Sequence, residues 1–138
     1  MTGTTRIAAL RYALIATGLI FILGIFALIQ LWPSGWSWGV GHSHYLPMIL
    51  GVYATLGVFL LLASRDPLAN RSLIWFTVWS SVVHAVIMAF QGIADPAERG
   101  HMVGDVPALL LVAALLAFLT RRAATSTQVT NLGARRVA

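Results

Sequence analysis

The sequence has no cysteine and few charged residues. Without cysteine, disulfides, zinc–thiolate sites and cysteine-ligated iron–sulfur clusters are excluded. Charged residues make up only 9% of the 138 residues, whereas a soluble domain has about 25%. Hydrophobic residues make up 59%, and the mean hydropathy is +0.84. The composition therefore predicts an integral membrane protein with a single domain.

Common catalytic signatures are absent as well. The chain contains no Walker or Rossmann glycine pattern, no Gly-x-Ser-x-Gly and no His-Glu-x-x-His. It also lacks the paired intramembrane carboxylates that are typical of proton-driven transporters. The arginines behind the net charge of +5 stand singly or in pairs at the ends of apolar runs, so nucleic acid is not expected as a partner. The sequence indicates no particular reaction and no particular cofactor.

Four apolar runs predict helices at about 7–32, 47–64, 72–92 and 106–122. The first run has about 21 residues, longer than the roughly 7 to 15 of a signal-peptide core, so we expect it to remain as a membrane helix. Trp32 followed by Pro33 marks its end, because the residue before proline is disfavoured in a helix. The expected domain is 1–124, followed by a polar cytoplasmic tail, 125–138, without apolar periodicity.

The distribution of arginine predicts the orientation of these helices. With four spans, Arg99 lies on one side and the other eight arginines lie on the opposite side: Arg6, Arg11, Arg65, Arg71, Arg121, Arg122, Arg135 and Arg136. The positive-inside rule then places both termini in the cytoplasm. We therefore predict an all-α fold, an antiparallel four-helix bundle in the inner (plasma) membrane. The expected partners are the lipid bilayer and either further copies of the chain or a larger membrane complex.

The third apolar run contains His84, a side chain that titrates near neutral pH. At about 100° per residue, one stripe of this helix carries Thr77, Ser81, His84, Met88 and Gln91. An ionisable group in a bilayer normally faces protein or a water-filled cavity. We therefore predict that the stripe faces the bundle interior and that an intramembrane polar pocket includes His84, Thr77, Ser81 and Gln91. The expected neighbours on the second helix are Gly51, Thr55 and Val58.

Two roles for His84 are open on the sequence. A neutral imidazole can simply donate a hydrogen bond to a neighbouring helix. Alternatively, His84 is a ligand or a proton carrier, since histidine binds haem iron and metals through a ring nitrogen. The polar stripe also suits a quinone headgroup. A bis-histidine haem would need a second histidine from a loop or from another subunit.

The loops on the arginine-poor side collect further histidines and acids. These residues are His42, His44, His101, Asp95, Glu98 and Asp105. A His-x-His pair with a third histidine and carboxylates is chemically competent to bind a divalent transition metal. The alternative is that they are solvated surface groups and helix caps. Asp95-Pro96-Ala97-Glu98 has the form of a helix start, which predicts a short surface helix ending near Gly100.

Four short motifs carry a resemblance to a known group of proteins. They are Trp32-Pro33-Ser34-Gly35-Trp36, Gly41-His42-Ser43-His44-Tyr45, Trp79-Ser80-Ser81-Val82-Val83-His84 and Gly104-Asp105-Val106-Pro107. Together they resemble a family of small bacterial four-helix membrane proteins with a domain of unknown function, over nearly Arg6 to Arg122. A more distant likeness is to DoxX-like proteins. The resemblance implies a four-helix membrane fold and no specific activity.

Three classes of function are compatible with this sequence. The first is an accessory or scaffold subunit that acts through helix packing, which we favour because no catalytic motif is present. The second is a redox membrane subunit that binds haem, a metal or a quinone through His84 and the outer-loop histidines. The third is a small transporter component.

Overall fold

The computed structural model describes residues 3–36 and 45–137, and every regular element in these ranges is helical. The elements are α1 (Gly3–Leu19), the π-helical turn η1 (Ile20–Gly24), α2 (Ile25–Leu31), α3 (Pro33–Trp36), α4 (Tyr45–Ala63), α5 (Arg71–Ala94), the 3-10 helix η2 (Pro96–Met102) and α6 (Asp105–Val137). Four helical stretches are long and apolar enough to cross a membrane: Gly3–Leu31, Leu46–Ala63, Arg71–Ala94 and Pro96–Thr125. The predictions of an all-α chain and of four apolar helices are confirmed. Their antiparallel insertion in a bilayer stays a prediction.

The helix ends follow local chemistry in most places. α2 ends at Leu31, directly before Trp32 and Pro33, as the sequence predicts. Asp95 caps η2, because its side chain accepts a hydrogen bond from Ala97 N at 2.9 Å. α6 differs from the expected 106–122, since it continues to Val137 through the segment expected to be a tail. Ala123 and Ala124, two strong helix formers, follow the arginine pair and prolong the helix.

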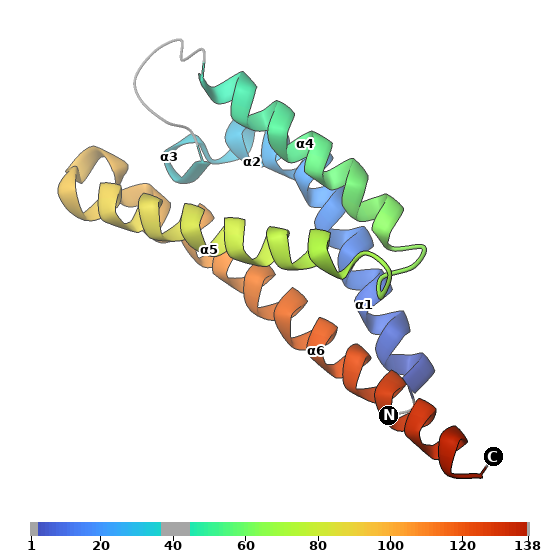
Figure 1. Ribbon diagram of the computed structural model, residues 1–138. Coiled ribbons are helices and arrows are strands. Elements are labelled where there is room, and N and C mark those ends of the chain that lie inside the picture. Colours follow the sequence, from blue (N-terminus) through green and yellow to red (C-terminus); the bar gives the residue numbers. More distant parts are fainter. Residues whose placement is uncertain (1–2, 37–44, 138) are drawn as a thin grey trace.

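The long helices pack around α1 and α6 (Figure 1). α1 contacts both α4 and α6, and α5 lies along α6. Leu10 and Leu14 of α1, Ile74 of α5 and Leu116 of α6 are fully buried in the core between them. Lipid tails are as apolar as these side chains, so the packing gains close van der Waals contact rather than transfer out of water. Both ends of the chain lie at the same end of the molecule (Figure 1).

α1 and α4 approach each other most closely at two glycines, Gly18 and Gly57. A Cβ added at Gly57 would lie 2.6 Å from the backbone oxygen of Gly18, and one added at Gly18 would lie 2.8 Å from the oxygen of Gly57. Real Cβ atoms do not approach a backbone oxygen so closely. The missing side chains therefore permit the contact, as small residues commonly do between membrane helices.

This contact determines which face of α4 points inward. Tyr53, Gly57 and Leu60 follow one another at helical spacing, and they turn toward α1 and the interior. Gly51 and Thr55 are exposed, and nothing lies within 4 Å of a Cβ placed at Gly51.

The prediction that Gly51, Thr55 and Val58 face His84 is therefore wrong. The 48% exposure of Val58 agrees with the outward position of this face. Small residues do favour a close helix contact, but Gly57 makes the contact with α1, and Gly51 does not.

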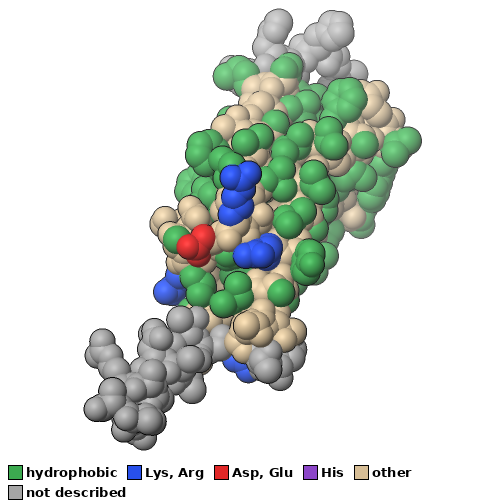
Figure 2. Space-filling model, turned by 90° about the vertical axis from the view of Figure 1, so that its right-hand side faces the viewer, with side chains coloured by type: hydrophobic (Ala, Val, Ile, Leu, Met, Phe, Trp, Pro, Cys, Tyr) green, Lys and Arg blue, Asp and Glu red, His purple; other side chains and the backbone are tan. Residues whose placement is uncertain are grey.

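The surface of the protein is largely apolar. Figure 2 shows hydrophobic side chains over most of one face, with charged side chains confined to a few places. Large apolar residues are exposed on α5, with Trp79 at 64% and Phe90 at 70%. Soluble monomers rarely present apolar patches of this extent. The surface fits a multi-pass membrane protein.

A polar turn joins α4 to α5, and α1 holds it in place. Arg11 Nε donates to the backbone oxygen of Ser64 at 2.9 Å, and Arg11 Nη2 donates to that of Arg65 at 3.2 Å. Within the turn, Asp66 Oδ1 accepts from Ala69 N at 3.2 Å. The arginine thereby satisfies carbonyl groups that the end of α4 leaves without helical partners.

Candidate functional site

His84 makes a hydrogen bond to a tyrosine on another helix. Its Nδ1 atom lies 2.8 Å from the hydroxyl of Tyr53 on α4, and the two ring centroids are 5.7 Å apart. Phe21, which is buried in η1, packs edge-on against Tyr53 at 4.9 Å and 83°. Sequence reasoning did not identify Tyr53. The available signal was a phenol inside an apolar run, because a buried tyrosine hydroxyl usually requires a partner.

The rest of the predicted His84 stripe divides into two parts. Thr77, Ser81 and Met88 are buried, as predicted. The hydroxyl of Thr77 donates to the backbone oxygen of Leu73 at 2.9 Å, so this group is satisfied within its own helix. Gln91 is exposed and lies at the surface near Asp95 and Glu98. Of the four residues proposed for the pocket, only His84 lines the cavity beside Tyr53.

This cavity lies between α2, α3, α4, α5 and the start of α6. Its volume is ≈ 40 Å³, and its polar lining residues are Trp36, Tyr53, His84 and Asp105, with aliphatic side chains around them. One water needs roughly 10 to 15 Å³ measured in this way. The space therefore suits a few waters. It is far smaller than the roughly 300 to 1,000 Å³ of pockets for drug-sized ligands.

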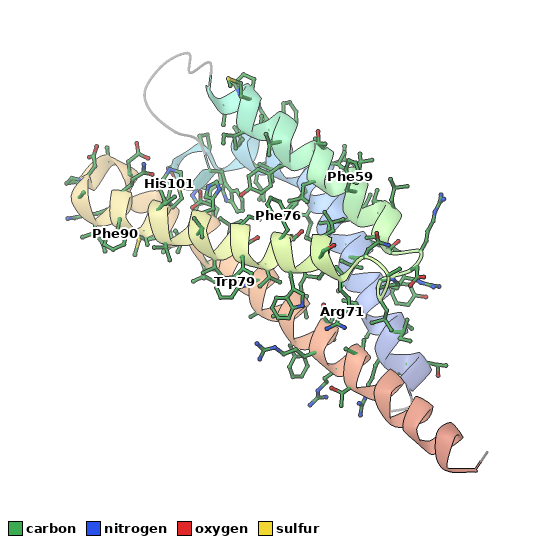
Figure 3. The ribbon with its side chains drawn as sticks, viewed as in Figure 1. Phe59, Arg71, Phe76, Trp79, Phe90 and His101 are labelled. Atoms are coloured by element: carbon green, nitrogen blue, oxygen red, sulfur yellow. The ribbon has the colours of Figure 1, made fainter. Side chains whose placement is uncertain are left out.

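A second polar cluster, Glu98–His101–Asp105, adjoins the cavity. The imidazole of His101 is fully buried, and Figure 3 shows it where η2 meets the ends of α5 and α6. His101 Nδ1 lies 3.0 Å from Asp105 Oδ2, and His101 Nε2 lies 3.0 Å from Glu98 Oε2. A protonated imidazole can donate to both carboxylates, whereas a neutral one can donate to only one.

The burial of Asp105 corrects an expectation from the sequence. The sequence placed Asp105 in a loop, either as a candidate metal ligand or as a solvated helix cap. In the structure it is 6% exposed and lines the same cavity as His84. The cause is the position of η2, which folds over the end of α5 where Gly92 has no side chain and Met102 fills the space. The four-residue spacing from His101 to Asp105 was the available signal.

The six candidate metal ligands are only partly brought together. Glu98, His101 and Asp105 are neighbours, but the two carboxylates contact opposite nitrogens of one ring and so do not converge on a common point. In the described ranges, no group of three histidine, cysteine or acidic side chains could hold a metal ion. Asp95 is exposed and caps η2 instead. His42 and His44 lie outside the described residues, so the full set stays a prediction.

A double-mutant cycle tests the bond between Tyr53 and His84. We expect Tyr53→Phe to lower the free energy of unfolding in bicelles by about 0.6 kcal/mol, the usual value for a hydrogen bond between membrane helices. Combining it with His84→Leu should cost less than the two single effects added together, because both substitutions remove the same bond. Tyr12→Phe is the control, since Tyr12 is 70% exposed. Strict additivity would show that the bond contributes nothing to stability.

Comparison with known proteins identifies a relationship but no activity. A family model described as a family of unknown function (DUF6632) matches residues 4–136, which include all four apolar helices and the site residues above. No curated protein and no solved structure matches the chain.

Proposed function

The chain belongs to this family of unknown function, and we propose that it is an accessory or scaffold subunit of the inner (plasma) membrane that acts through helix packing. In this proposal the four apolar helices cross the bilayer as an antiparallel bundle with both termini in the cytoplasm. The partner is a transmembrane helix of another copy or of a larger membrane complex. A groove between α4 and α5 is the observation that supports it.

The groove has a volume of ≈ 330 Å³ and an apolar lining. Its lining residues are Gly51, Val52, Thr55, Leu56 and Phe59 on α4, and Leu73 and Phe76 on α5. α4 packs mainly against α1 and η1 and makes little contact with α5 (Figure 1). Gly51 and Thr55 are four residues apart on the exposed face, and such pairs of small residues let a second helix come close. The groove is therefore suited to a partner helix.

Photo-crosslinking in the native membrane tests this proposal. We expect a photoreactive residue at Thr55 to crosslink to a protein partner of defined mass. The same residue at Ala27, which is exposed on α2 outside the groove, should give no protein adduct. Adducts to lipid alone at position 55 would mean that acyl chains fill the groove, and the scaffold proposal would then fail.

The topology has its own test, which uses the absence of native cysteine. We expect a cysteine at position 97 to react with an impermeant maleimide added to intact cells. A cysteine at position 69 should react only after the membrane is permeabilised, because the arginine distribution places the α4–α5 turn in the cytoplasm. Ala69 and Ala97 are both exposed, so a difference between them reports sidedness. Labelling of position 69 from outside would refute the orientation.

A cofactor-binding redox subunit is the second candidate. The hydrogen-bonded pair of Tyr53 and His84 favours it, since both side chains can exchange protons with a redox group bound beside them. An absorption spectrum and a metal analysis of the purified protein separate the two candidates. A Soret band or a stoichiometric metal would favour the redox subunit over the scaffold.

A further inference from the structure

We propose that Glu98, His101 and Asp105 form a proton path from the arginine-poor face of the protein to the cavity at His84. The path is independent of the scaffold function, because none of its residues lines the groove between α4 and α5. His84 lies ten residues before the end of α5 at Ala94. That separation is about 15 Å along a helix, so the imidazole needs a route to exchange protons with water.

The outer half of the path consists of direct contacts. The Glu98 side chain is 26% exposed and borders a surface hollow of ≈ 290 Å³ with Gln91 and Asp95. It lies 3.0 Å from Nε2 of the fully buried His101, whose Nδ1 lies 3.0 Å from Asp105 Oδ2. The contact with Asp105 is a hydrogen bond, and the contact with Glu98 is at ion-pair distance. His101 thus bridges a solvated carboxylate and a buried one.

Proton transfer through His101 is balanced at each step. A proton passes from the Glu98 carboxyl to Nε2, and the proton on Nδ1 then passes to Asp105, so the ring gains one proton and loses one. The ring is left neutral in its other tautomer. A proton leaves His84 by the same steps in reverse. Moving one proton to His84 and back therefore does not require the buried His101 ring to rotate.

The inner half of the path crosses the cavity. Asp105 Oδ1 and Trp36 Nε1 are buried, and neither has a hydrogen-bond partner among the described residues. Both residues line the cavity with His84, and Asp105 is near enough to His84 to interact with it electrostatically. An acceptor and a donor that face ≈ 40 Å³ of space are the conditions under which buried waters are ordered. Such waters can carry a proton from Asp105 to His84.

The surroundings of the path contain few competing charges. In the described part of the chain, the titratable groups that line the cavity are Tyr53 on α4, His84 on α5 and Asp105 on α6, and Glu98 on η2 contacts His101. The cavity residues from α2 are Ile25 and Ile29, and α3 supplies Trp36. Among the described residues no arginine lines the cavity, so a proton that enters is exchanged among these groups.

Nuclear magnetic resonance of the full-length protein, labelled with ¹⁵N-histidine in nanodiscs, tests the path. The measured quantity is the rate at which the His84 imidazole proton exchanges with water, with the signal assigned through His84→Gln. We expect Asp105→Asn and Glu98→Gln each to slow this exchange about tenfold or more, because an amide cannot replace a carboxyl as an acid–base relay. Asp95→Asn should leave the rate unchanged, since Asp95 is exposed and its side chain accepts from Ala97 N as the cap of η2, which asparagine can also do.

Two outcomes would overturn the proposal. One is wild-type exchange in a Glu98→Gln protein whose ¹⁵N shifts for His84 and His101 are otherwise normal. The other is equal slowing by Asp95→Asn, which would indicate a general change in the stability of η2. Should Asp105→Asn fail to fold, Glu98→Gln still decides the matter, because the Glu98 side chain is partly solvated and the glutamine has the same shape.

Discussion

Replacing Gly57 with leucine is expected to prevent α4 from packing on α1. A Cβ at this position would lie 2.6 Å from Gly18 O, 2.8 Å from Ile22 Cγ1 and 3.2 Å from Phe21 Cβ. The nearest of these is a backbone atom, which cannot move aside as a side chain can. Alanine alone should cost about 1 to 3 kcal/mol, the usual range for overpacking, and leucine more. We therefore expect the Gly57→Leu variant to give little folded monomer in detergent, measured by size-exclusion chromatography after graded heating.

Gly51 provides a matched control on the same helix. Nothing lies within 4 Å of a Cβ at this position, so Gly51→Ala should be neutral or stabilising by up to about 1 kcal/mol through helix propensity. Gly57→Ala should also weaken the ¹⁵N signature of the bond between Tyr53 and His84, because a shifted α4 carries the phenol away from the ring. Equal stability of the two alanine variants would contradict the assigned helix contact.

Replacing His101 with leucine is expected to have the second large effect. The substitution leaves the carboxylate of Asp105, which is 6% exposed, without its partner. Leaving a buried polar group without its hydrogen-bond partner typically costs about 1 to 3 kcal/mol, and more if the group is charged. Losing the contact with His101 should cost Glu98 less free energy, because its side chain is 26% exposed and water can replace the lost contact. We expect a corresponding fall in the free energy of unfolding in bicelles.

The double variant His101→Leu/Asp105→Leu distinguishes a lost partner from lost packing. Replacing both members of a buried pair by apolar side chains is often neutral or stabilising, so the double variant should recover much of the lost stability. It should nonetheless be unable to pass protons to His84. A double variant whose loss equals the sum of the two single losses would show that Asp105 is not penalised by losing His101.

The free-energy cost of burying the Glu98–His101–Asp105 cluster is an argument about its role. An apolar cluster could fasten η2 to the end of α5 at least as well as Glu98, His101 and Asp105 do. Ionisable side chains are expensive to bury, and those that are buried are enriched at functional sites. The combination of buried ionisable groups, a cavity and His84 therefore favours a functional role over a purely structural one.

The sequence by itself determined the elements of this protein that depend on neighbouring residues. Apolar run length predicted four helices, the Trp32–Pro33 step predicted the end of the first, and Asp95 before Pro96 predicted the cap of η2. Helical periodicity also predicted that Thr77 and Ser81 face inward. Each of these properties is set within one or two turns of the chain, where spacing and cap chemistry are sufficient.

Only the tertiary structure decided how these elements form the candidate site. The partner of His84 is Tyr53, 31 residues away, and it faces the imidazole because the contact between Gly18 and Gly57 fixes the rotation of α4. The burial of Asp105 likewise depends on η2 folding over the end of α5. An apolar membrane helix is hydrophobic on all sides, so its composition does not specify its rotation. Close contacts between distant residues specify it, and they exist only in the folded chain.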